Sequence, residues 1–417
     1  MLVPNFDFQK LDLNKLVQLN YVDLATEVIS TFVPEDGKEL IHQACLNAYG
    51  KGLFPEIVVP VKKAGDVYVA ELFHGQTAAF KDMALSLLPH LMTLSLKQLK
   101  EDREVMILAA TSGDTGKAAL EGFKDVEGTC IKVFYPLDGV SAIQQQQMVS
   151  QEGKNVKVVG IHGNFDDAQS AVKVAFGDKM LKEVSDQHHV FLSSANSINV
   201  GRLIPQIVYY FHSYFELVRS KEIEMGDQVN FCVPSGNFGN ITAGLFGKKM
   251  GLPVKRFIAA NNRNDIFYQY LQTGKYNPRP SIATIANAMD VGDPSNFARV
   301  LDLYSGSHAD ISAEISGTTY TDEQIRETVK ETWKEHHYLL DPHGACGYRA
   351  LVEGLKEGET GVFLETAHPA KFLETVESII GESVEIPAKL QEFMKGEKKS
   401  LQMTKEFADF KNYLLSL

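Results

Sequence analysis

The amino-acid sequence predicts an α/β protein with parallel sheets, and three observations support this class. Short runs rich in valine, isoleucine and alanine alternate with helical patterns along most of the 417 residues, and glycine recurs in the turns between them. No uninterrupted apolar run approaches the ~18 residues of a membrane-spanning helix. Repeated strand, turn and helix favour parallel sheets with right-handed crossovers. Ligands bind such folds at the carboxyl ends of strands, so the strand-to-helix turns are the first candidates for function.

The predicted strands are short apolar runs rich in β-branched residues. They cover residues 66–72, 105–110, 130–135, 156–161, 229–233, 255–260 and 362–365. A helix is expected over 80–97, where apolar residues follow the i, i+3, i+4 spacing of a buried face, and Pro89 should kink or split it. Further helices should begin near Gly116 and Asn240, and residues 387–417 have a charged, helical pattern.

The length of the chain predicts about two to three domains. We expect residues 1–100 to form an N-terminal segment that includes the 80–97 helix. Residues 101–190 should form a smaller α/β domain, and residues 191–417 a larger α/β domain that ends in helices. With 44% hydrophobic and 23% charged residues, the chain has the composition of a folded globular protein.

Composition and charge exclude several classes of protein. The 41 basic and 53 acidic residues give a net charge of −12, which argues against binding to nucleic acid but not against a local anion site. Residues Met1 to Asp7 lack the basic and apolar regions of a signal peptide. The cysteines are far apart and show no CxxC pairing, so we expect buried thiols rather than zinc ligands or disulfides. They are Cys45, Cys130, Cys232 and Cys346. These observations predict a cytoplasmic protein that contacts neither membranes nor nucleic acid.

The turn after the 229–233 strand has the residues of a phosphate site. It reads Pro234-Ser235-Gly236-Asn237-Phe238-Gly239-Asn240. Glycine and asparagine permit left-handed backbone angles and close approach of a ligand. If a helix begins at its end, free N–H groups and the positive end of the helix dipole face the turn. No Gly-Lys-Ser/Thr follows, so this is not a Walker A loop. A tight turn with a helix cap explains the same residues equally well.

The turn after the 105–110 strand is dense in hydroxyl groups. It reads Thr111-Ser112-Gly113-Asp114-Thr115-Gly116 at the start of a helix. Hydroxyls and backbone N–H groups there could hold a carboxylate. Alternatively, Ser112, Asp114 or Thr115 could simply cap the helix.

Two more turns carry a lysine and a neutral hydroxyl. Lys81 opens a helix, where the dipole lowers its pKa slightly, as Schiff-base chemistry requires. It could instead be a surface lysine paired with Asp82. After the last predicted strand, Thr366 could cap a helix or present its hydroxyl to a ligand nitrogen, and His368 is more often a structural residue. Together the four turns match the needs of pyridoxal phosphate: a lysine, donors for its phosphate and a partner for its ring nitrogen.

Six motifs, in order along the chain, resemble those of the threonine synthase family. They lie at residues 71–82, 111–116, 194–202, 234–240, 288–296 and 366–372. The resemblance is to the bacterial and fungal branch, and extends over roughly residues 40 to 372. It implies a fold-type II pyridoxal phosphate enzyme, similar to the tryptophan synthase β subunit, with two open, parallel-rich sheets flanked by helices and an N-terminal segment. It also implies conversion of O-phospho-L-homoserine and water to L-threonine and inorganic phosphate, by γ-elimination and β-addition of water.

The resemblance also implies roles for individual residues. Lys81 would be the catalytic residue and would carry the cofactor, and Thr366 would bond the pyridine nitrogen. The cofactor phosphate would be held by Gly236, Asn237, Phe238 and Asn240, with Gly239 shaping the turn. The substrate carboxylate region would meet Ser112, Asp114 and Thr115. The substrate phosphate would be gripped by Asn196, Ser197, Asn199 and Arg202, of which the arginine suits bidentate binding.

The sequence departs from the family pattern at three positions, and two alternative functions stay open. Gln76 stands where the family usually has proline, Ala78 where it often has leucine, and Asp114 where relatives outside this branch have asparagine. One alternative is a fold-type II lyase or dehydratase, although Arg202 argues against substrates that carry no phosphate. The other is a non-catalytic binder of a small phosphorylated ligand, which would leave Lys81 without a role. We expect a monomer or homodimer that acts on a small molecule.

Overall fold

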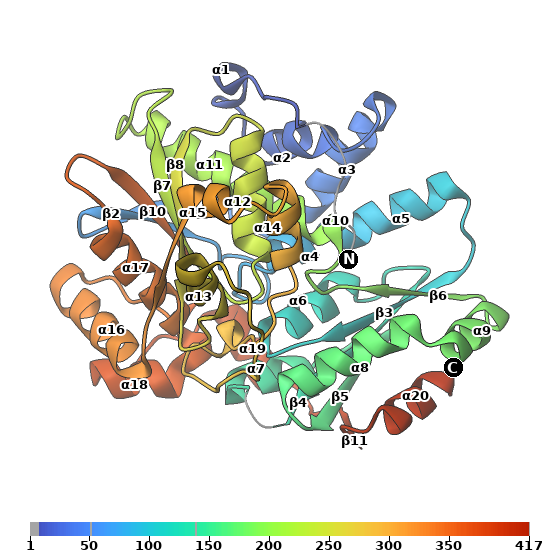
Figure 1. Ribbon diagram of the computed structural model, residues 1–417. Coiled ribbons are helices and arrows are strands. Elements are labelled where there is room, and N and C mark those ends of the chain that lie inside the picture. The colour runs from blue at the N-terminus through green and yellow to red at the C-terminus, as the bar shows by residue number, and fades with distance from the viewer. Residues whose placement is uncertain (1–7, 51, 138–139, 417) are drawn as a thin grey trace.

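The computed structural model describes residues 8–50, 52–137 and 140–416, so the expectation for Met1 to Asp7 lies outside the described residues (Figure 1). The chain forms two sheets. The larger one has the strand order β1-β2-β10-β7-β8-β9 and the smaller one β11-β5-β4-β3-β6. Every strand pair is parallel except β1 with β2. The predicted α/β class with parallel-rich sheets is therefore confirmed.

The strands of the larger sheet are β1 (Val61–Ala64), β2 (Val67–Glu71), β10 (Thr360–Glu365), β7 (Val229–Pro234), β8 (Val254–Asn261) and β9 (Ile315–Thr319). Those of the smaller sheet are β11 (Leu401–Thr404), β5 (Val156–His162), β4 (Thr129–Pro136), β3 (Glu104–Ala110) and β6 (Val190–Ser194). All seven predicted strands are present within two residues at either end. Strands β1, β6, β9 and β11 were not predicted, because they are short and lack a clear apolar pattern.

Helices cover both faces of each sheet (Figure 1). The larger sheet packs against α2 (Tyr21–Ser30), α3 (Lys38–Tyr49), α11 (Pro205–Arg219) and α12 (Gly239–Lys249) on one face, and against α16 (Asp322–His336) and α17 (Pro342–Gly354) on the other. The smaller sheet packs against α6 (Asp114–Phe123) and α7 (Ala142–Val149) on one face, and against α8 (Phe165–Gly177), α9 (Lys179–Gln187) and α20 (Phe407–Leu415) on the other.

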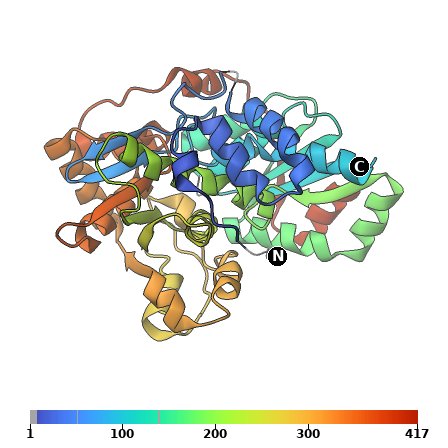
Figure 2. The same cartoon turned by 90° about the horizontal axis from the view of Figure 1, so that it is seen from above.

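The remaining helices connect these layers. They are α1 (Leu13–Leu16), α4 (Asp82–Leu85), α5 (Leu88–Leu99), α10 (Val200–Leu203), α13 (Ile266–Thr273), α14 (Phe297–Leu303), α15 (His308–Glu314), α18 (Leu373–Ile380) and α19 (Ala388–Met394). Three short 3-10 turns are η1 (Glu35–Gly37), η2 (Asn287–Met289) and η3 (Pro369–Phe372). In the view from above, the blue N-terminal helices α2 and α3 lie in the foreground, over the middle of the molecule (Figure 2).

The expected 80–97 helix is split into α4 and α5, and Pro89 lies in the first turn of the second piece, as its fixed φ and missing N–H favour. The helical pattern of residues 387–417 corresponds to α19 and α20, but between them β11, which was not predicted, pairs in parallel with β5, so the chain returns to the smaller sheet. Buried Phe410 and Leu414 of α20 then pack on that sheet.

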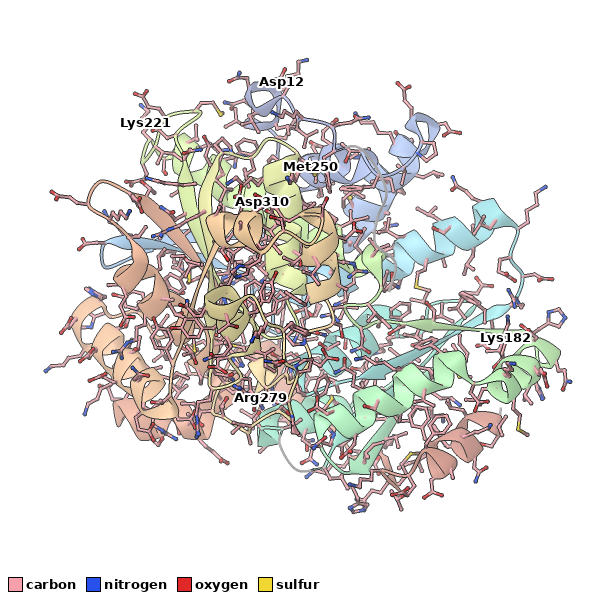
Figure 3. The ribbon with its side chains drawn as sticks, in the orientation of Figure 1. Asp12, Lys182, Lys221, Met250, Arg279 and Asp310 are labelled. Carbon is pink, nitrogen blue, oxygen red and sulfur yellow. The ribbon has the colours of Figure 1, made fainter. Side chains whose placement is uncertain are left out.

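The division into residues 1–100, 101–190 and 191–417 stays a prediction. In the structure β1 and β2 belong to the larger sheet, and β11 belongs to the smaller one. Lys182, in α9 beside the smaller sheet, and Lys221, just after α11 beside the larger sheet, lie on opposite sides of the molecule (Figure 3). Among the described residues, no helix is long and apolar enough to cross a membrane. The four cysteines form no disulfide, and three of them are buried.

Candidate active site

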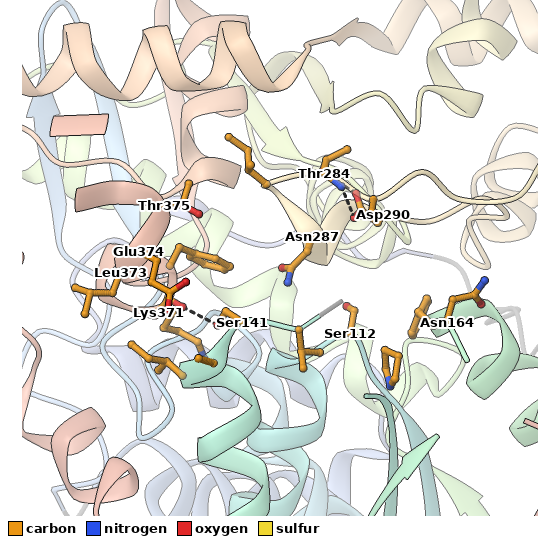
Figure 4. A pocket seen from close by; sticks show the side chains of 18 of the residues that line it. Ser112, Ser141, Asn164, Thr284, Asn287, Asp290, Lys371, Leu373, Glu374 and Thr375 are labelled. Atoms are coloured by element: carbon orange, nitrogen blue, oxygen red, sulfur yellow. Dashed lines mark hydrogen bonds between the residues drawn. The ribbon is translucent and has the colours of Figure 1, made fainter. Parts of the chain in front are cut away.

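The carboxyl ends of strands from both sheets meet at one narrow cavity of about 90 Å³. Every residue singled out from the sequence as a site residue lines it, except Asp114 and Asn199. A wider cavity of about 570 Å³ shares Ser112 and Phe165 with the narrow one and contains Lys371, Asn287 and the other residues drawn in Figure 4. The four turns found in the sequence are therefore neighbours in space.

The turn after β7 leaves a row of backbone donors free. The N–H groups of residues 236–240 have no acceptor among the described residues, and α12 begins at Gly239. Phe238 holds a left-handed φ of 63°, which aims the turn into the helix start. A Cβ on Gly236 would lie 2.8 Å from the Cα of Met289, so only glycine fits there. Free N–H groups at a helix N-terminus are suited to a phosphate.

Asn240 adds a side-chain donor to this turn. Its Oδ1 accepts hydrogen bonds from the hydroxyls of Tyr209 at 2.6 Å and Tyr210 at 2.7 Å. Its Nδ2 is buried and has no partner among the described residues. A buried donor without an acceptor is costly, so an anion bound at the turn would relieve that cost. The turn thus fits the phosphate of pyridoxal phosphate.

Lys81 is half-buried and forms no ion pair with any described residue. The alternative pairing with Asp82 is wrong, because that carboxylate accepts from the backbone N–H of Thr77 at 2.8 Å and from its hydroxyl at 2.6 Å. Burial lowers the pKa of Lys81 to about 8, although the charge of Asp114 opposes that shift. Far more of the amine is therefore unprotonated near neutral pH than in an ordinary lysine with a pKa of 10.5, although the protonated form still predominates.

Thr366 presents an unengaged hydroxyl to the cavity. Its side chain is 6% exposed, and its Oγ1 has no partner among the described residues. Its carbonyl accepts from the N–H of Phe80 at 2.8 Å, which ties it to the turn that carries Lys81. Thr366 is not a helix cap: the Nδ1 of His368 accepts from the N–H of Ala370 and caps η3 instead.

The turn after β3 is closed by a residue that the sequence did not single out. Thr111 Oγ1 accepts from the N–H groups of Gly113 at 2.9 Å and Gly116 at 2.8 Å, so the expected caps Ser112, Asp114 and Thr115 do not perform that role. The hydroxyl of Ser112 has no partner among the described residues and borders both cavities. It is available to a ligand.

Asp114 points away from the narrow cavity into a buried ion pair. Its Oδ1 lies 2.8 Å from Lys371 Nζ and accepts from Gln144 Nε2 at 3.0 Å. Burial alone would raise the pKa of Asp114, but Lys371 and Lys81 outweigh it and hold that pKa well below its usual range. The repulsion expected between an aspartate and an anionic substrate is thus avoided.

Arg202 is a buried cation with no carboxylate partner among the described residues. Its side chain donates to the carbonyl of Ala195 at 2.9 Å and to Thr115 Oγ1 at 3.5 Å, and its Nε has no partner there. Burial lowers its pKa to about 10, so it stays charged at neutral pH. A buried charge needs a counterion, and the cavity it lines gives an anion access to it.

The three polar residues near Arg202 build the walls around it. The Asn196 amide exchanges two hydrogen bonds with the backbone of Ala110, at 3.0 and 2.7 Å. Ser197 Oγ accepts from Asn237 Nδ2 at 2.7 Å, which joins this wall to the phosphate turn. Asn199 caps α10 and donates to the carbonyl of Ser194 at 2.9 Å, outside the cavity lining.

Sequence reasoning missed a histidine in the cavity wall. The Nδ1 of His343 bonds Asp341, and its Nε2 accepts from the N–H of Ala288 at 3.1 Å. The bond to Ala288 holds residues 288–289 in place, and these residues lie against Gly236 of the phosphate turn. The signal was present as Asp341-Pro342-His343, since an aspartate before proline commonly caps a helix, and Asp341 caps α17.

The fold and this set of residues define a pyridoxal phosphate-dependent enzyme of fold type II. Residues 59–366 match the family model described as "Pyridoxal-phosphate dependent enzyme", and residues 344–414 match "Threonine synthase, C-terminal". The threonine synthase of Haemophilus influenzae is 38% identical over 405 residues, which are 97% of this chain and 90% of that protein. The threonine synthase of Escherichia coli K12 is 39% identical over 391 residues, or 94% of this chain and 86% of that one.

Solved structures agree with the relatives. The structure of Escherichia coli threonine synthase has a TM-score of 0.88 and 36% identity, covering 98% of this chain and 92% of its own. A pyridoxal phosphate-bound threonine synthase from Brucella melitensis has a TM-score of 0.87 and 33% identity, covering 98% and 92%. The chain belongs to the threonine synthase family, and it is a pyridoxal phosphate-dependent lyase of amino-acid biosynthesis.

Proposed function

We propose that the narrow cavity performs the threonine synthase reaction: O-phospho-L-homoserine and water give L-threonine and inorganic phosphate. The observation that supports this choice is a pair of separate anion sites. The turn at residues 236–240 offers N–H groups that are free, and Arg202 is buried without a carboxylate partner, in both cases as far as the described residues go. A cofactor phosphate needs only one of them, so the second suits a substrate that brings its own phosphate.

The cofactor fits the residues present. Pyridoxal 5′-phosphate, when bound, supplies an electron-withdrawing ring next to the substrate's Cα. The N–H groups of Gly236, Asn237 and Phe238, together with Asn240 Nδ2, would hold its phosphate. Lys81 would attach it covalently, and the Thr366 hydroxyl would bond the ring nitrogen. A hydroxyl, unlike a carboxylate, does not keep that nitrogen protonated, which disfavours transamination as a side reaction.

Lys81 moves protons in this proposal. With a pKa near 8, its amine is partly unprotonated at neutral pH and can take the proton from Cα of the substrate. The protonated amine can later return a proton to the carbon chain. Burial and the positive charges of Arg202 and Lys371 disfavour the charged form of Lys81, whereas the negative charge of Asp114 favours it, and the pKa of Lys81 is lowered as a result.

The substrate's two anionic groups would bind at neighbouring parts of the cavity, because Arg202 donates to Thr115 Oγ1 at 3.5 Å. Arg202 and Ser197 would hold the phosphate on Cγ and stabilise it as it leaves, with Asn196 lining the cavity beside them and Asn199 capping α10 outside the lining. Ser112 and Thr115 would receive the carboxylate region. Asp114 would act there through Lys371 and Gln144, as a positioning residue.

Product analysis tests this function. The holoenzyme incubated with O-phosphohomoserine should release threonine and inorganic phosphate in equal amounts. Formation of 2-oxobutanoate and ammonia in place of threonine would favour the lyase or dehydratase. A protein that stays colourless with added pyridoxal phosphate and releases no phosphate would favour the non-catalytic binder.

We further propose that the enzyme acts in the cytoplasm as a monomer or homodimer. The free, mostly buried thiols suit a reducing compartment, and the net charge of −12 suits a soluble protein that does not bind nucleic acid. Light scattering on the purified holoenzyme would measure the assembly, and a mass above that of two chains would contradict this part of the proposal.

A further inference from the structure

A second cavity, here called the rear cavity, lies behind the two turns that carry Lys81 and Thr366. It has a volume of about 760 Å³. The wall between the two cavities contains an antiparallel bridge between Ala79 and Ala367, where the N–H of His368 also bonds the carbonyl of Ala78 at 3.0 Å. Both Ala78 and His368 line the rear cavity. A molecule bound there would touch the backbone next to the cofactor lysine.

Aromatic and other apolar side chains form much of the rear cavity. Phe54 and Phe73 are buried, and Trp333 and Tyr338 are half-buried. The rings of Phe73 and His368 meet edge to face at 5.3 Å. The volume lies within the range of about 300–1,000 Å³ typical of small-molecule sites, which are mostly apolar with a few placed polar groups.

The charges around the rear cavity favour an anion. Its one acidic lining residue, Glu71, is already engaged: it bonds Lys62 at 3.0 Å, His74 at 2.8 Å and Tyr338 at 3.0 Å. Lys389 forms no ion pair with a described residue, and its Nζ only approaches the carbonyl of Leu53 at 3.5 Å.

His368 adds a neutral donor at the same place. Burial lowers its pKa to about 4, so the ring is neutral at pH 7. Its Nδ1 accepts from the N–H of Ala370, which leaves the hydrogen on Nε2. Among the described residues, neither Lys81 nor any residue of the turn at 236–240 lines this cavity, so the proposed reaction does not use it.

We propose that the rear cavity binds a small organic carboxylate with a flat apolar body, its ring among the aromatic side chains and its carboxylate near Lys389. The ligand would act from behind on the turns that hold the cofactor. This site is distinct from the proposed substrate site, and binding there does not depend on which reaction the enzyme catalyses.

Trp333 makes the proposal measurable, because it is the only tryptophan of the chain and lines the cavity. We would titrate the holoenzyme with benzoate and with its neutral analogue benzamide, and record tryptophan fluorescence. Benzoate should change the signal with saturation, and benzamide should bind at least about threefold more weakly. Lys389→Gln should weaken benzoate binding by about threefold to tenfold. Lys395→Gln, a lysine of the same segment that does not line the cavity, should leave it unchanged.

The outcomes separate the proposal from its rivals. Benzoate binding that weakens in Lys389→Gln but not in Lys395→Gln supports it. Equal binding of benzoate and benzamide, an unsaturable signal, or identical affinity in the two lysine variants overturns it. Since fluorescence needs no turnover, a failure here leaves the proposed reaction untouched, and a failed product analysis leaves this site untouched.

Discussion

Lys371 Nζ lies 2.8 Å from Asp114 Oδ1, and both side chains are almost completely buried. Asp114 begins α6, directly after a strand of the smaller sheet, whereas Lys371 lies in η3, after a strand of the larger sheet. Lys371 also donates to the carbonyl of Thr77 at 2.9 Å, in the turn that leads to Lys81. The ion pair therefore joins the segment after β3 of the smaller sheet to the segment after β10 of the larger sheet, close to Lys81.

Removing one member of this pair should destabilise the protein strongly, because the other charge stays buried and unpaired. We expect Asp114→Asn or Lys371→Met to lower the free energy of unfolding by about 3–5 kcal/mol, measured by urea denaturation. The exposed pair of Lys399 with Glu397 is a matched control, and Lys399→Gln should cost less than about 1 kcal/mol. If the variants of both ion pairs lower the free energy of unfolding by the same small amount, the buried pair does not stabilise the protein as expected.

The same pair predicts an acid limit to stability. The pKa of Asp114 is lower in the folded protein than in the unfolded chain, so its contribution is complete above the unfolded value near 4. It should be lost progressively as the pH falls from there toward the folded value. Melting temperatures recorded between pH 3 and 6 should therefore fall less steeply at the acid end in Asp114→Asn than in the wild type. Parallel curves would show that Asp114 does not titrate in this way.

Lys81 should set the pH dependence of cofactor attachment. Burial disfavours its charged form, so the proton leaves at a pH near 8 instead of the ordinary 10.5. The rate at which apoenzyme regains covalently bound cofactor should rise with pH and level off above about 8. Borohydride reduction and peptide mapping should place the cofactor on Lys81, and Lys81→Ala should lose at least about 10³-fold in kcat. A midpoint near 10, or a different labelled lysine, would refute the assignment.

Arg202→Ala should lower kcat/KM for O-phosphohomoserine by about tenfold to a hundredfold, because it removes a charge-assisted contact of roughly 1.5–3 kcal/mol. Part of the loss should appear in kcat, since the leaving phosphate gains charge. Arg202→Lys should recover only some of it. The affinity for pyridoxal phosphate should not change. The exposed Arg326→Ala serves as control. A loss of thermal stability with normal kinetics would make Arg202 a structural residue.

Asn240→Asp should weaken pyridoxal phosphate binding by about tenfold or more. The carboxylate keeps the acceptor for Tyr209 and Tyr210 but replaces the free Nδ2 donor with a negative charge toward the phosphate. Cofactor dissociation constants measured by absorbance would check this. Asn412→Asp, at an exposed position of α20, is the charge-matched control. Unchanged affinity in Asn240→Asp would remove this residue from the phosphate site.

Thr366→Val should change the absorption spectrum of the bound cofactor and lower threonine formation, while the melting temperature stays within a few degrees. The hydroxyl has no partner among the residues that the structure describes, so its loss should cost little stability, but the ring nitrogen would lose its partner. Thr366→Asp should shift the spectrum further, since a carboxylate favours a protonated ring nitrogen. If both variants keep the wild-type spectrum and full activity, Thr366 lies outside the site.

The local pattern of the sequence was sufficient for the main strands and for the four turns that hold the chemistry. Runs such as 105–110 and 229–233 are apolar enough to be buried on both faces, and each ends in glycines and hydroxyls that leave few alternatives to a tight turn. The lysine, the hydroxyl and the phosphate turn are likewise properties of short segments. The order of the six motifs along the chain then indicated the threonine synthase family.

Only the tertiary structure decided which distant residues meet. Strands β6 and β11 have no apolar period of their own and exist because the edges of the smaller sheet accept them. Asp114 meets Lys371, Arg202 meets Thr115, and Asn240 meets Tyr209 and Tyr210 across long stretches of sequence. Burial and charge compensation are sums over all neighbours in three dimensions, whereas the sequence pattern records only near neighbours. The sequence therefore showed which turns carry reactive and anion-binding groups, and the packing of the two sheets decided which partners those groups have.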